Sequence, residues 1–182
     1  MTRLPRTIRL DASDTVVFAR AAEPGEWAVP GTFLFAGREP TSLTRKEAIA
    51  FRGGFLGVET FGHSTLVTVV EATAADRAAM IEALARGLVA HLGAPDLATA
   101  LPAAAEEVAE AERLVAGHPA GRLIALHRTA EAGGAIRERF RSLRPRDETV
   151  FAGTLLRGHD RAFHIVEETE DIDIRHLDGG ER

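Results

Sequence analysis

Arginines gather around one predicted turn, and guanidinium groups are well suited to bind carboxylates or phosphates. His127 and Arg128 precede the turn at residues 131–134, and the arginines that follow it are Arg137, Arg139, Arg141, Arg144 and Arg146. If both flanking segments are strands, several of these side chains meet on one face of a sheet. The sequence therefore predicts an anion- or partner-binding site formed by His127, Arg128, Arg137, Arg139 and Arg141.

The same arginines also fit a second interpretation, a solvated strand face paired with nearby acids. Glu138, Asp147, Glu148 and the acidic C-terminal residues would be the counter-charges. Composition favours this interpretation, because Lys46 is the only lysine among 22 basic residues. Abundant arginine and alanine are what a GC-rich genome produces without any functional demand.

Catalytic and cofactor motifs do not accompany the cluster. The chain has no cysteine, which excludes disulfides, thiolate metal ligands and a cysteine nucleophile. Its seven histidines show no H-x-H or H-E-x-x-H spacing, and no serine lies in a G-x-S-x-G elbow. Helix ends, tight turns and close backbone approach explain the glycines at 53, 54, 57 and 62 better than a phosphate loop. We therefore assign no catalytic residue, metal ligand or cofactor.

The general properties of the chain define its class. At 182 residues we expect one domain, residues 1–182, and the net charge of −5 argues against nucleic acid as a partner. There is no apolar signal core and no segment of membrane-spanning length, so we expect a cytoplasmic protein. The expected partners are a protein or a small anionic ligand, and we expect a homodimer.

A buried strand that leads into an amphipathic helix is the strongest local pattern. The apolar run 66–70 is of strand length, and Thr73 with Asp76 is typical of a helix N-terminus. Gly93 and Pro95 end the helix. Its apolar stripe is predicted to consist of Ile81, Leu84, Ala85, Leu88 and Leu92.

The N-terminal region is predicted to contain short strands and one helix. Strands are expected at 6–10 and 14–19, around a turn, and at 32–36 and 55–61. Thr44 and Glu47 form a capping box for a helix at 45–52. Trp27, in a loop rich in Gly and Pro, either packs over the rim of the core or stacks on a ligand, and packing is favoured.

Further along the chain, Pro102 is predicted to begin a second helix that extends through Val115, with a solvated face of Glu106, Glu107, Glu110 and Glu112. A strand follows at 122–129. Residues 135–143 fit a helix or a strand, and the preceding Gly-Gly turn favours the strand. A hairpin is expected at 149–157 and 161–167, and residues 168–182 are predicted to form a frayed acidic tail. The predicted fold is α+β, a largely antiparallel sheet with two or three helices on one face.

Three stretches carry a family resemblance: RTIRLDASDTVVFARAAEPGEWAVPG, FRGGFLGVETFG, and GRLIALHRT with IRERFRSLR. Together they resemble a small family of uncharacterised bacterial proteins, a domain of unknown function, over most of the chain. The resemblance assigns no role to any residue, and it implies an accessory role beside an oxidoreductase system that depends on molybdenum.

The leading functional interpretation is thus a non-catalytic binding or accessory protein. The alternative is a small enzyme acting on an anionic metabolite, with His127 as acid or base and Arg128, Arg139 or Arg141 holding the anion.

Overall fold

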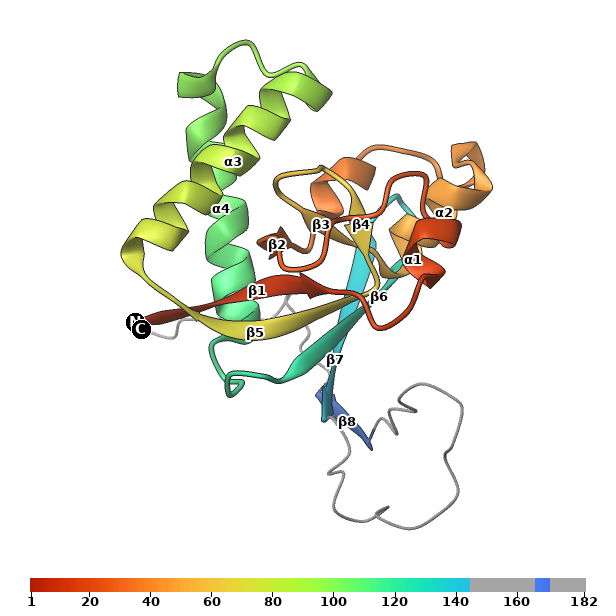
Figure 1. Ribbon diagram of the computed structural model, residues 1–182. Coiled ribbons are helices and arrows are strands. Elements are labelled where there is room, and N and C mark those ends of the chain that lie inside the picture. Colours follow the sequence, from red (N-terminus) through yellow and green to blue (C-terminus); the bar gives the residue numbers. More distant parts are fainter. Residues whose placement is uncertain (145–165, 171–182) are drawn as a thin grey trace, which may run out of the picture.

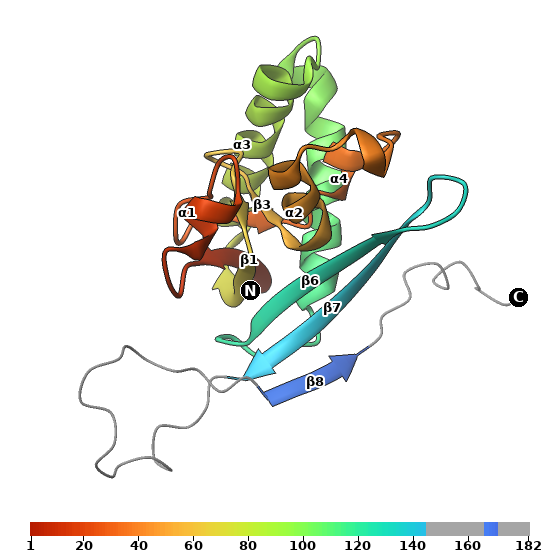
Figure 2. The same ribbon diagram turned by 90° about the vertical axis from the view of Figure 1, so that its right-hand side faces the viewer.

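The computed structural model describes residues 1–144 and 166–170, and it has an α+β architecture (Figure 1). The main sheet has the strand order β1-β5-β6-β7-β8, and every neighbouring pair is antiparallel. Its strands are β1 (Thr2–Ile8), β5 (Leu66–Ala72), β6 (Leu123–Ala130), β7 (Ile136–Arg144) and β8 (Val166–Glu170). A smaller antiparallel sheet contains β2 (Ala28–Val29), β3 (Phe55–Gly57) and β4 (His63–Ser64). The larger helices lie on one side of the main sheet, as predicted (Figures 1 and 2).

Two antiparallel helices, α3 (Ala74–Leu92) and α4 (Leu97–Val115), connect β5 to β6. The Thr73 hydroxyl accepts a hydrogen bond from the Asp76 backbone N–H, and the Asp76 carboxylate accepts one from the Thr73 N–H, so the predicted start of α3 is confirmed. Gly93, with a φ of 73°, ends the helix. In the described part of the chain, no helix is both long and apolar enough to cross a membrane.

The predicted start of α4 at Pro102 is wrong. The Asp96 carboxylate accepts a hydrogen bond from the Thr99 N–H at 2.7 Å and so caps the helix at Leu97. Pro102 therefore lies inside the helix, where it is exposed. The helix extends through Val115 as predicted, and the side chains on its apolar stripe are buried: Ala104, Val108, Ala111 and Val115.

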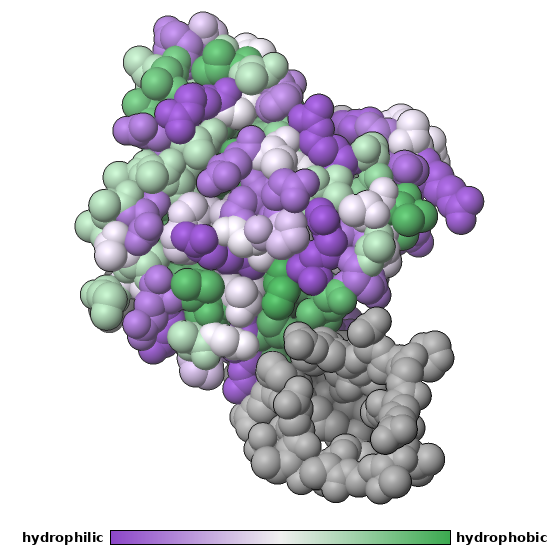
Figure 3. Space-filling view, viewed as in Figure 1, coloured by the Kyte–Doolittle hydropathy of each residue, from purple (hydrophilic) through white to green (hydrophobic). Residues whose placement is uncertain are grey.

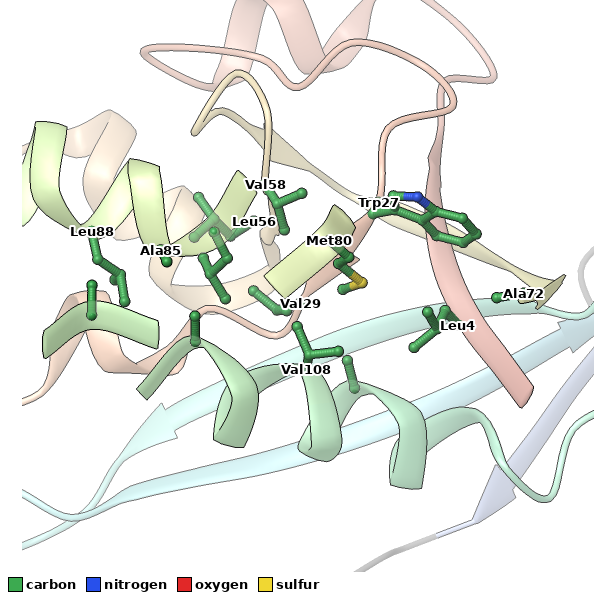
Figure 4. Packing of buried hydrophobic residues seen from close by; sticks show 14 residues of the cluster. Leu4, Trp27, Val29, Leu56, Val58, Ala72, Met80, Ala85, Leu88 and Val108 are labelled. Carbon is green, nitrogen blue, oxygen red and sulfur yellow. The ribbon is translucent and has the colours of Figure 1, made fainter. Parts of the chain in front are cut away.

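The largest core cluster lies between α3, α4 and the N-terminal strands (Figure 4). Met80 contributes a fully buried side chain that the predicted stripe did not include. Leu92, which the stripe did include, is 49% exposed, because it lies at the end of α3 where the chain turns toward α4. Hydrophilic and hydrophobic residues alternate on the surface around this turn, at the top of Figure 3. Trp27 is buried in the same core, and this burial confirms the packing interpretation. The guanidinium carbon of Arg6 lies 3.8 Å from the centroid of its ring.

A short helix, α1 (Ser13–Val17), replaces the strand predicted at 14–19. The Asp11 carboxylate accepts the Ser13 N–H at 2.7 Å and starts the turn. The buried Asp14 carboxylate then accepts hydrogen bonds from the backbone N–H and the hydroxyl of Thr65. This long-range contact fixes the helical turn, whereas the apolar run Val16–Phe18 alone had indicated a strand.

Two short 3₁₀ helices, η1 (Thr32–Phe35) and η2 (Pro40–Ser42), precede α2 (Arg45–Gly53). The strand predicted at 32–36 is wrong: Gly31, with a φ of 76°, reverses the chain, and the Leu34 N–H bonds to the Gly31 carbonyl. The predicted capping box of Thr44 and Glu47 is present at the start of α2.

The strand predicted at 55–61 stops at Gly57 because a buried carboxylate organises the turn that follows. Glu26 accepts hydrogen bonds from the N–H groups of Glu59 and Thr60 and from the Thr60 hydroxyl. A Cβ at Gly57 would lie 2.4 Å from the Glu26 carboxyl carbon. Close backbone approach, expected for this glycine, is therefore confirmed.

Residues 168–170, at the start of the predicted acidic tail, are part of β8 and pair with β7. Residues 171–182 and the predicted strand at 149–157 lie outside the described part of the chain, as does most of the predicted strand at 161–167.

Candidate functional site

The β6–β7 hairpin carries every residue of the predicted site. Gly133 and Gly134, with φ of 87° and 82°, form its turn, and the Glu131 N–H bonds to the Ala135 carbonyl at 2.7 Å. Left-handed φ values of this kind favour glycine. Residues 136–144 are therefore a strand, the choice that the Gly-Gly turn favoured. Figure 2 shows the hairpin as a long twisted ribbon whose tip projects from the body of the protein.

Four of the five predicted residues share one side of this hairpin, which we call the outer arginine face: His127, Arg137, Arg139 and Arg141. All four are exposed. His127 is the register partner of Arg139, and residues directly opposite each other on antiparallel strands project on the same side. Arg137 donates from Nε to Glu131 Oε1 at 2.7 Å. The structure thus brings three arginines and one histidine together at the surface.

Arg128 lies on the opposite side of the hairpin and is only 1% exposed. Its Nε donates to Glu138 Oε1 at 2.9 Å and to Thr32 Oγ1 at 2.8 Å. The two terminal nitrogens donate to backbone carbonyls, which are those of Pro30, Ala50, Phe51 and Gly54. Arg128 therefore ties the β6 strand to the η1 and α2 segments and is separated from the outer arginine face.

Burial lowers the pKa of Arg128 from its ordinary value, and the neighbouring Glu138 and Glu107 carboxylates oppose this change. Because the ordinary pKa of arginine lies so high, the guanidinium stays charged. A buried guanidinium with a carboxylate and several carbonyls as acceptors has a structural role in the fold, since each of its three nitrogens donates within the protein.

Glu107 on α4 was predicted to lie on a solvated face but is half-buried. Burial raises the pKa of Glu107 to about 7, and repulsion from Glu110, Glu138 and Glu106 adds to the increase. The helical period of the sequence predicted that Glu107 lies with the other acids of α4 on the solvated face of the helix. No local pattern indicated that the hairpin would bring Glu138 close to it.

His63 is the second titratable group that the sequence did not single out. Burial, together with the positive charge of Arg128, lowers the pKa of His63 to about 4. Its ring lies near those of Phe18 and Phe35, with centroids 5.6 and 6.3 Å away. The Nε2 atom is buried without a hydrogen-bond partner among the described residues. The imidazole is therefore neutral in the folded protein at physiological pH.

Metal ligation has no candidate in residues 1–144: no group of three or more His, Asp or Glu side chains there could hold an ion.

No curated protein is significantly similar to this chain, and no solved structure is either. The model of a family of unknown function, DUF6505, matches residues 1–156, a span that includes the complete β6–β7 hairpin, and the chain therefore belongs to this family.

Proposed function

We propose that this protein is a cytoplasmic binding protein and that its outer arginine face binds an acidic segment of a partner protein. The observation that carries the proposal is the register of β6 and β7, which gathers His127, Arg137, Arg139 and Arg141 on one exposed surface. The protein as a whole carries a net charge of −5, so this surface is a local concentration of positive charge on an acidic molecule.

The arrangement of the arginines favours an extended partner over a small anion. Alternate residues of a strand are spaced by about 7 Å, so Arg137, Arg139 and Arg141 form a row about 14 Å long. One carboxylate or phosphate reaches one or two guanidinium groups of such a row, whereas successive acidic side chains of a peptide can reach all three. A partner of this kind is consistent with the accessory role that the family resemblance implies.

The enzyme alternative has less support. Its version with Arg128 as the anion holder requires His127 and Arg128 to act on one metabolite, but these neighbours in β6 project to opposite sides of the sheet. Arg128 already donates to Glu138, Thr32 and several carbonyls. His127 would have to act with Arg139 and Arg141 alone, on an open surface.

The proposal can be tested with a short fluorescent oligoglutamate peptide and anisotropy titrations. We expect affinity that falls as salt concentration rises, because the contacts are exposed ion pairs. Changing Arg137, Arg139 and Arg141 to Glu should weaken binding about tenfold or more.

The matched control changes three exposed arginines outside this face, Arg52, Arg86 and Arg113, to Glu and has the same net charge. It should retain most of the affinity. Equal losses in the two triple variants would contradict the proposal, as would citrate binding at the face as tightly as the peptide. The expected homodimer is a separate prediction, tested by the mass from light scattering.

A further inference from the structure

A pocket of about 470 Å³ opens between the tip of the β6–β7 hairpin and the segment 35–43 that leads toward α2. This volume lies within the range of pockets that hold small organic molecules. The hairpin tip contributes Ala130, Glu131, Gly133, Gly134 and Ile136 to its lining. Figure 2 shows the tip projecting beside this part of the molecule. The pocket is distinct from the outer arginine face, because no residue of that face lines it.

The floor of the pocket is apolar and aromatic. Phe35 and Phe51 are 4% and 8% exposed, and their rings meet edge to face with centroids 5.4 Å apart. Leu43 and Ile136 are partly buried and pack against the same cluster. A floor of this composition stabilises a flat apolar group by removing it from water, as in most small-molecule sites.

The rim of the pocket is charged, and most of its charge is already paired. Arg38 donates to Glu47 at 2.9 Å, and Glu131 accepts from Arg137 at 2.7 Å. Glu39 is also on the rim and is exposed, and no ion pair between residues 1 and 144 includes it. The uncompensated charge at the entrance is therefore negative, which favours a cationic ligand.

We propose that this pocket binds a small molecule that combines an apolar ring system with an amino group. The ring lies on the floor formed by Phe35 and Phe51, and the ammonium group lies near the Glu39 carboxylate. The hairpin tip forms one wall, so the ligand bridges the main sheet and the segment before α2.

Three compounds with the same ring and different charges test the proposal: naphthylmethylamine, naphthylmethanol and naphthoate. Amide NMR spectra of the full-length protein report where and how tightly each compound binds. We expect concentration-dependent shifts confined to residues 35–43, 51 and 130–136. The amine should bind about threefold or more tightly than the alcohol, and naphthoate should bind more weakly than both, because an exposed ion pair contributes up to about 1 kcal/mol.

Two pairs of variants complete the test. Leu43→Trp should fill the pocket and abolish the shifts, whereas Leu92→Trp, the same change at a 49% exposed position on α3, should leave them intact. Glu39→Gln should remove the preference for the amine over the alcohol, and Glu106→Gln, an exposed acid on α4, should preserve it. Melting temperatures show whether each variant is folded.

The proposal is overturned if no compound shifts the pocket amides at millimolar concentration, or if a folded Leu43→Trp protein binds as well as the unchanged protein does. It is also overturned if naphthoate binds as tightly as the amine. The result is independent of the oligoglutamate titration, since the two experiments probe different surfaces.

Discussion

The Arg128 guanidinium and the Glu138 carboxylate face each other across the β6–β7 hairpin, with Nε and Oε1 2.9 Å apart and the arginine side chain completely buried. They are register partners, so the pairing of the strands and the ion pair support each other. The guanidinium also bonds to carbonyls of the segments before and within α2. One side chain thus connects the hairpin to Pro30 and to the α2 segment.

Replacing Arg128 should therefore be far more damaging than replacing an arginine of the outer face. We expect Arg128→Met to lower the free energy of unfolding by about 3–5 kcal/mol, because Glu138 and the carbonyls lose their donor inside the protein. Arg139→Met should cost less than about 1 kcal/mol. Urea unfolding of both variants measures the difference, and similar losses would contradict the structural role assigned to Arg128.

Glu107 should make the protein less stable as the pH rises. Its folded pKa of about 7 lies above its ordinary value of 4.5, so the contribution of the protonated carboxyl to stability is complete below pH 4.5 and is lost as the pH rises through 7. The carboxyl is partly exposed, which limits the loss to about 1 kcal/mol. Urea unfolding of Glu107→Gln at pH 4.5 and pH 8 should lack this loss, whereas Glu71→Gln, a change at an exposed acid on β5, should behave like the unchanged protein.

His63 should make the protein less stable as the pH falls, which is the opposite of the effect of Glu107. Its folded pKa of about 4 lies below its ordinary value of 6.5, so the stability associated with the neutral ring is complete above pH 6.5 and is lost as the pH falls toward 4. The loss should amount to about 2 kcal/mol. His63→Leu should remove this part of the acid sensitivity in urea unfolding at pH 7 and pH 4, and an unchanged pH profile would refute the assignment.

Gly57 should not tolerate a methyl group. Gly57→Ala would place Cβ 2.4 Å from the Glu26 carboxyl carbon and displace the carboxylate that organises the turn after β3. We expect a loss of about 1–3 kcal/mol in thermal unfolding. Gly117→Ala is the matched control, since a Cβ there meets no atom within 4 Å, and it should change stability by less than about 0.5 kcal/mol.

The sequence predicted the parts of the fold that depend on near neighbours. The Thr73–Asp76 cap and the αL glycine at 93 define α3 within a few residues of each end. The Gly133-Gly134 turn identified β7 as a strand, and alternation along it separated Arg137, Arg139 and Arg141 from Phe140. In each case the determining atoms lie close together in the chain.

The wrong predictions concern residues whose deciding contacts are made with parts of the chain that are distant in sequence. The Asp14 carboxylate that stabilises α1 bonds to Thr65, 51 residues away. The predicted binding site included both Arg128 and His127 because both are basic, although adjacent residues of a strand project to opposite sides of the sheet. The carbonyl acceptors of Arg128 lie 74 to 98 residues earlier in the chain. The raised pKa of Glu107 likewise depends on Glu138, which only the folded hairpin brings near.

The pairing of β1 with β5 also has a consequence for synthesis of the chain. Thr2 pairs with Ala72 and Ile8 with Leu66, so β1 has no partner until β5 has emerged from the ribosome. α3 and α4 lie between β5 and β6 in the chain, so β6 can pair with β5 only after both helices have been made. Contacts between distant residues slow folding because a long loop must close before they form. Until β5 pairs with it, β1 therefore presents unpaired backbone groups that another chain could bind, and it needs protection from aggregation during synthesis.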